Sequence, residues 1–212
     1  SSNENINWKE DTIEQYKELL NWEILSINPK IPWSYDFVKT FEQYIDFGRL
    51  YYVKGLNAKS CKPWTKKILD EYCDVWNWSI LSGCNYLPWD KELIKQFENK
   101  WSWYSLCKNE SIPWQSDFII DFYKHINWEA LCSNIAFPWT EELIEIYKEK
   151  IDWKSLAKNK TFPWTVNFIE NILEIKINDK NDVFLLELCE NTSLPWSEYL
   201  VELFINKIGR AH

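Results

Sequence analysis

The chain has 212 residues, and 24 basic against 32 acidic side chains give it a formal net charge of −8. This acidity disfavours a duplex nucleic-acid partner, because affinity for a duplex comes largely from Lys and Arg side chains that neutralise phosphates. No segment approaches the roughly 18 consecutive apolar residues of a membrane-spanning helix, so we expect no membrane insertion. The 15 Trp and only 4 Gly favour a helical protein over a turn-rich β-sandwich.

The dipeptide Pro-Trp recurs along the chain, and its successive steps are 31, 25, 25, 25, 25 and 32 residues. A fixed period of this length is the signature of a repeat protein. Trp8 occupies the same place in a first unit, where Asn7 replaces the proline. The Trp residues of the dipeptide are Trp33, Trp64, Trp89, Trp114, Trp139, Trp164 and Trp196.

A second Trp lies 14 residues after the first and begins a predicted short helix, which we call helix A. An Asn, Asp or Ser precedes this Trp in each unit, and these are favoured N-cap residues. An Asn also follows the helix in most units, and we interpret it as a residue that ends the helix in the left-handed conformation. The helix A Trp residues are Trp22, Trp78, Trp103, Trp128 and Trp153.

The residues after Pro-Trp predict a longer helix of about 11 residues, which we call helix B. In the unit at residue 140, Thr140 is the predicted N-cap, and Leu143, Ile144, Tyr147 and Ile151 form one apolar stripe. Neither helix is long enough to be stable alone, so neighbouring units must cover their apolar faces.

These elements predict an all-α fold, a solenoid of tandem repeats that forms a single array over residues 1–208. The spacing is irregular near residues 46–52 and 176–183, where we expect a longer helix or an added loop. Residues 209–212, Gly-Arg-Ala-His, are interpreted as a tag remnant or a disordered tail. We expect a cytoplasmic location, unless a leader has been removed from the N-terminus.

The segment from Trp22 to Trp33, Trp-Glu-Ile-Leu-Ser-Ile-Asn-Pro-Lys-Ile-Pro-Trp, carries the most complete copy of the unit. It resembles the Trp-rich tandem repeats of uncharacterised proteins from AT-rich bacteria and, more loosely, those of large DNA viruses. The resemblance covers nearly the whole chain. It implies a helical repeat, and it implies no particular activity.

The candidate reactive residues favour structural roles. Six Cys form no Cys-x-x-Cys motif, and three of them share one repeat position with Ser26, Ser82 and Ala157, which indicates a small packed site rather than a disulfide or metal site. Of the two His, His125 lies near the end of a helix B, where the helix dipole favours a basic residue. The sequence therefore predicts no catalytic, cofactor or metal site, and no enzyme. The three Cys residues at the shared repeat position are Cys107, Cys132 and Cys189.

The Trp residues allow two interpretations. Their fixed register favours a structural role, and Trp76 and Trp101 fall on apolar stripes that predict burial. A partly exposed row of Trp would instead stack on sugars, quaternary amines or bases.

The sequence thus favours a binding or scaffold module that presents a curved surface to a protein partner. Ligand or glycan binding through exposed Trp is one alternative, and an acidic inhibitor of a basic partner is another. Variable positions on helix B are the predicted binding surface, namely Lys39, Gln43, Lys95, Ile120, Asp121 and Glu145.

Overall fold

The computed structural model describes residue 6 and residues 8–50, 65–176 and 182–208. Over these residues it contains fourteen helices and no strand, which confirms the all-α helical-repeat class. The chain forms two compact units, residues 1–102 and 103–212, and each is described by itself. No helix in the described ranges combines the length and apolar character needed to cross a membrane.

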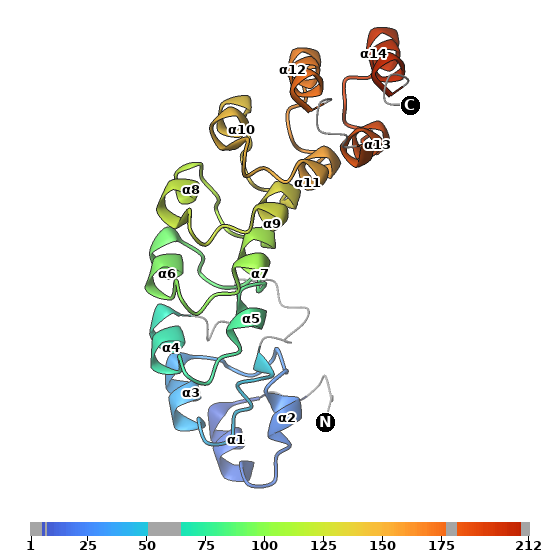
Figure 1. The fold of residues 1–212 in the computed structure, drawn as a ribbon. Coiled ribbons are helices and arrows are strands. Elements are labelled where there is room, and N and C mark those ends of the chain that lie inside the picture. Colours follow the sequence, from blue (N-terminus) through green and yellow to red (C-terminus); the bar gives the residue numbers. More distant parts are fainter. Residues whose placement is uncertain (1–5, 7, 51–64, 177–181, 209–212) are drawn as a thin grey trace. The chain divides into compact units, whose positions relative to one another are not determined.

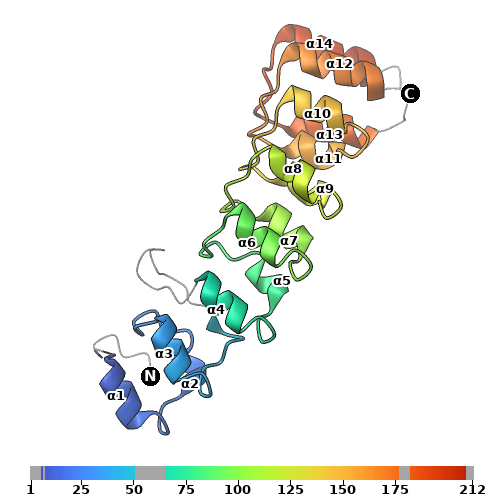
Figure 2. The same cartoon turned by 90° about the vertical axis from the view of Figure 1, so that its left-hand side faces the viewer.

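The first unit contains two helices of type A and four of type B, which lie in two rows (Figures 1 and 2). Its A helices are α2 (Trp22–Leu25) and α5 (Trp78–Leu81). Its B helices are α1 (Glu10–Tyr16), α3 (Tyr35–Thr40), α4 (Lys66–Glu71) and α6 (Lys91–Gln96).

The second unit continues the same alternation, and its A helices contact one another in chain order (Figure 1). The A helices are α7 (Trp103–Lys108), α9 (Trp128–Ser133), α11 (Trp153–Lys158) and α13 (Asp182–Glu190). The B helices are α8 (Asp117–Phe122), α10 (Glu141–Tyr147), α12 (Val166–Lys176) and α14 (Glu198–Ile208).

Most B helices are shorter than the sequence predicts. In α6 the α-helical hydrogen bonding ends at Gln96, and residues 97–100 continue as turns. Only α12 and α14 reach eleven residues. The α12 helix leads into the second irregular region, of which residues 177–181 lie outside the described residues. Of the first irregular region, residues 47–49 form a turn and residues 51–52 lie outside the described residues.

Side-chain caps begin both kinds of helix, as expected. The Asn21 carboxamide accepts the main-chain N–H of Ile24 at 3.1 Å before a helix A. The Thr140 hydroxyl accepts the N–H of Leu143 at 3.3 Å before a helix B. Each bond satisfies a donor that the first helical turn leaves without an intrahelical acceptor.

The helix A Trp packs on the helix B that follows it. Its partner is the aromatic residue eight positions after the next Pro-Trp. Ring centroids are 5.5 Å apart for Trp22 and Phe41 and 5.4 Å apart for Trp128 and Tyr147. These rings hold the two short helices of a repeat together, since neither is stable alone.

A ladder of buried Asn side chains joins successive A helices in the second unit. The Asn134 carboxamide donates to the carbonyl oxygens of Cys107 at 2.8 Å and Asn109 at 3.3 Å. Asn159 makes the same pair of bonds one repeat later, to Cys132 and Asn134. The ladder supplies buried carbonyl groups with donors, which buried polar groups require.

The ladder corrects the interpretation of these Asn residues as left-handed helix ends. Asn134 has φ −75° and ψ 118°, and Asn159 has φ −71° and ψ 113°, so both are extended. Their carboxamides bridge repeats, and the carbonyl of Asn159 also accepts the indole N–H of a Pro-Trp residue, whereas the indole of Trp139 donates to Leu131. Trp164 donates to the Asn159 carbonyl at 3.2 Å.

The small position of helix A also bridges repeats. The hydroxyl oxygen of Ser26 accepts the main-chain N–H of Asp46 at 2.9 Å, and Ser82 accepts that of Ser102 at 2.8 Å. Both Ser side chains are fully buried. The position therefore requires a small side chain, and where Ser occupies it the hydroxyl also accepts a hydrogen bond from the next repeat.

Candidate functional site

The predicted surface residues are all exposed, and four of them occupy one repeat position. Lys39, Lys95, Ile120 and Glu145 each lie six residues after the Trp of a Pro-Trp dipeptide. The chemistry at this position changes from basic to apolar to acidic while the buried positions stay nearly constant. Ile120 is 71 % exposed.

The two units each carry part of this predicted surface. Lys39, Gln43 and Lys95 lie in the first unit, where Lys39 forms ion pairs with Glu42 at 3.1 Å and Glu71 at 2.8 Å. The pair with Glu71 links α3 to the neighbouring helix α4, and the pair with Glu42 lies within one repeat, so acidic partners neutralise the charge of Lys39.

The other three predicted residues belong to the second unit. Ile120 and Asp121 lie on α8, and Glu145 lies on α10. Glu145 also lines a cavity.

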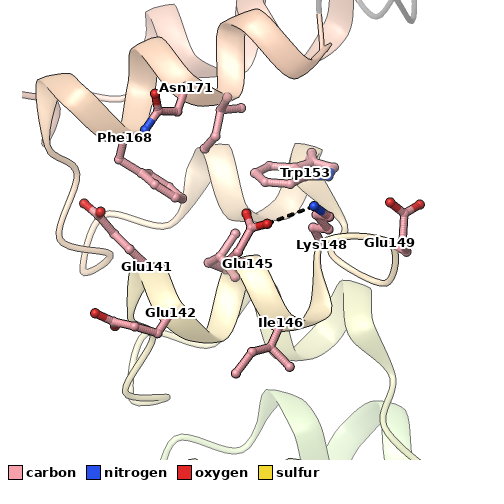
Figure 3. Close-up of a pocket in the computed structure, with 11 residues that line it drawn as sticks. Glu141, Glu142, Glu145, Ile146, Lys148, Glu149, Trp153, Phe168 and Asn171 are labelled. Atoms are coloured by element: carbon pink, nitrogen blue, oxygen red, sulfur yellow. Dashed lines mark hydrogen bonds and ion pairs between the residues drawn. The ribbon is translucent and has the colours of Figure 1, made fainter.

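That cavity is a groove of about 520 Å³ between α10, the start of α11 and α12 (Figure 3). Its apolar lining includes Ile144, Trp153, Phe168 and Ile172. In Figure 3 the rings of Phe168 and Trp153 lie on either side of Glu145. The volume falls within the range of roughly 300–1,000 Å³ that is typical of ligand pockets.

The groove coincides with a local exception to the repeat. Eight residues after Pro-Trp, the repeats before this one carry an aromatic residue, but the α12 repeat carries Ile172. Ile172 lacks the aromatic ring on which the helix A Trp packs in the earlier repeats. The side chain of Trp153 therefore lines the groove. The Trp153 ring contacts Phe184 edge-on at 5.8 Å. The aromatic residues at this position are Phe41, Tyr72, Phe97, Phe122 and Tyr147.

The charged lining of the groove is acidic. Four glutamates line it, and Lys148, which pairs with Glu145 at 2.8 Å, is the single basic residue in that lining. The main-chain N–H of Glu142 and the Thr140 hydroxyl bond to the Glu142 carboxylate and hold its pKa below the usual range. The four glutamates that line the groove are Glu141, Glu142, Glu145 and Glu149.

Most Trp residues serve the fold. The described Pro-Trp residues are buried except Trp196, which is 39 % exposed, and Trp64 lies outside the described residues. Trp76 and Trp101 are buried, as predicted, and each indole donates to a main-chain carbonyl. The helix A Trp residues are half-buried, and among these Trp153 lines the groove.

Cys107 and Cys132 are free thiols in the small buried position. Burial raises the pKa of both thiols to about 12, although each accepts a main-chain N–H, from Asn127 and Asp152 respectively. A protonated thiol is a poor nucleophile, which agrees with a packing role. Cys189 occupies the same repeat position and is exposed.

His125 lies near the end of the α8 segment, as the sequence predicts, and stacks on the Trp103 ring at 5.0 Å. Among the residues with described positions, no group of three or more His, Cys, Asp or Glu side chains is arranged to hold a metal ion.

Sequence reasoning missed the groove, although two signals in the sequence mark it. One is Ile172 at a position that is otherwise aromatic, and the other is the run of glutamates on a single helix B. No family model, curated protein or solved structure matches the chain.

Proposed function

We propose that the chain is a non-catalytic binding module that presents a helical-repeat surface to a protein partner. One observation carries the proposal: a single exposed repeat position, represented by Lys95, Ile120 and Glu145, changes its chemistry from repeat to repeat on a nearly constant scaffold. Exposed apolar residues on neighbouring B helices, such as Ile146, add contact area. Protein interfaces combine such apolar residues with a polar rim.

Capture of partners from a lysate of the native host, with the full chain as bait, tests this proposal. The matched variant carries Ile120→Asp and Ile146→Asp, which change two exposed side chains and leave the core intact. We expect a specific partner that the variant captures less well. Recovery of the same proteins at the same yield by both baits would contradict the proposal.

An acidic inhibitor of a basic partner is the second candidate function. The net charge of −8 and the four glutamates at the groove favour it. Binding of such a partner weakens as the salt concentration rises, because salt screens exposed charges. Affinity that is unchanged between low and high salt would therefore exclude this candidate.

Ligand or glycan binding through Trp has narrower support, since Trp153 is the helix A Trp whose side chain lines the groove. We also propose a cytoplasmic location, which suits the free buried thiols of Cys107 and Cys132. Membership in the Trp-rich repeat group likewise stays a proposal, supported by the motif of residues 22–33.

A further inference from the structure

We propose that the groove between α10 and α12 binds a short basic segment of a partner protein through one large apolar side chain flanked by Lys or Arg. This inference rests on the proposed function and deepens it, because it names the site and the chemistry of the partner. Three features of the groove carry it: its apolar floor, its acidic rim and its position at the exception to the repeat.

The floor selects an apolar side chain. Ile144 and Ile172 are buried aliphatic residues, and the rings of Phe168 and Trp153 complete the lining. When an apolar group displaces water from an apolar lining of this kind, the free energy of the system falls, which favours binding. At about 520 Å³, the groove is large enough to take a large apolar side chain of a partner.

The rim selects positive charge. Glu142 and Glu149 are exposed, and the Glu141 carboxylate accepts the Thr165 hydroxyl at 2.7 Å. Lys148 neutralises part of this charge through its pair with Glu145. Four carboxylates against one ammonium group leave a net negative rim, which attracts Lys or Arg and repels an acidic segment.

The repeat itself supplies the variant that tests the groove. Ile172→Phe installs the aromatic side chain that the equivalent position carries in the earlier repeats, so it fills the groove with a residue that the fold already accepts. The rim variant is Glu145→Gln with Glu149→Gln. Its matched control is Glu110→Gln with Glu129→Gln, which removes the same charge from exposed positions outside the groove.

The probe is a fluorescein-labelled peptide, Lys-Arg-Phe-Leu-Arg-Lys, and its binding to the full chain is followed by fluorescence anisotropy. Two further peptides replace Phe-Leu with Ser-Ser or replace the basic residues with Glu. We expect binding of the first peptide only. The rim variant should weaken binding by about tenfold at low salt, Ile172→Phe should weaken it at least as much, and the control variant should bind like the wild type.

Several outcomes would overturn the inference: no binding of the probe, equal binding of the Ser-Ser or acidic peptide, equal binding by Ile172→Phe, or displacement of the probe by tetramethylammonium alone. Circular dichroism and thermal unfolding show whether Ile172→Phe stays folded, and the rim variant keeps the test decisive if it does not. A partner captured from lysate equally by wild type and Ile172→Phe would contradict the groove and leave the proposed binding function standing.

Discussion

At the scale of single residues, the Asn that follows helix A occupies the repeat position with the strictest hydrogen-bonding requirements. Asn109, Asn134 and Asn159 are buried, and Asn134 and Asn159 hydrogen-bond to neighbouring repeats through both the carboxamide and the main-chain carbonyl. The Asn134 carboxamide donates to two carbonyls of the preceding repeat, while its oxygen accepts the N–H of Ala136 at 2.8 Å. No other side chain of this length offers two donors and an acceptor on one planar group.

Substitution Asn134→Ala should therefore destabilise the second unit by about 2–4 kcal/mol, because it leaves buried polar groups without partners. Denaturant unfolding followed by Trp fluorescence measures the change. The matched control is Asn28→Ala at the same repeat position, where the side chain is only half-buried, and we expect a cost of about 1 kcal/mol. Equal costs at the two positions would show that the ladder adds no stability.

At the scale of the element, a side-chain cap marks the start of most B helices. The α8 helix begins one residue later than its counterparts, at Asp117, which is three residues after Trp114. Gln115 stands where the other Pro-Trp repeats carry Ser, Thr or Asp, and α8 has no side-chain cap bond. The longer Gln side chain does not provide the short acceptor that an N-cap needs.

A pair of substitutions tests the caps in opposite directions. Thr140→Ala removes the bond to Leu143 and should destabilise the protein by about 1 kcal/mol. Gln115→Ser should supply the missing cap and stabilise it by up to about 1 kcal/mol. Thermal unfolding measures both changes. A loss of stability with Gln115→Ser would mean that Gln115 has a role that the cap rule does not describe.

At the scale of the whole molecule, stability is distributed over neighbouring repeats. The main contacts between the A helices of the second unit join neighbours in the stack, α7 with α9, α9 with α11 and α11 with α13. The stability of such an array is approximately a sum of repeat terms and interface terms. A destabilising substitution in one repeat should therefore weaken that repeat most, its immediate neighbours less and distant repeats least.

Leu131→Ala, at a fully buried position of α9, should cost about 2–5 kcal/mol. Hydrogen exchange should show the greatest loss of protection in α9, a smaller loss in α7 and α11, and the least in α14. Leu19→Ala, at a residue that is 83 % exposed, is the control and should change little. A uniform loss throughout the chain would instead indicate one cooperative unit.

The sequence by itself determined the repeat, the all-α class and the capped helix starts, because these features depend on residues only a few positions apart. Thr140 and Leu143, for example, form their cap within one turn. Only the tertiary structure revealed the role of the Asn that follows helix A and the location of the groove. The Asn134 bonds reach back 25 and 27 residues, and the groove requires Ile144 and Ile172 on separate helices to face one another. Such contacts arise only when the repeats stack in register, since their geometry depends on the path of the whole intervening chain.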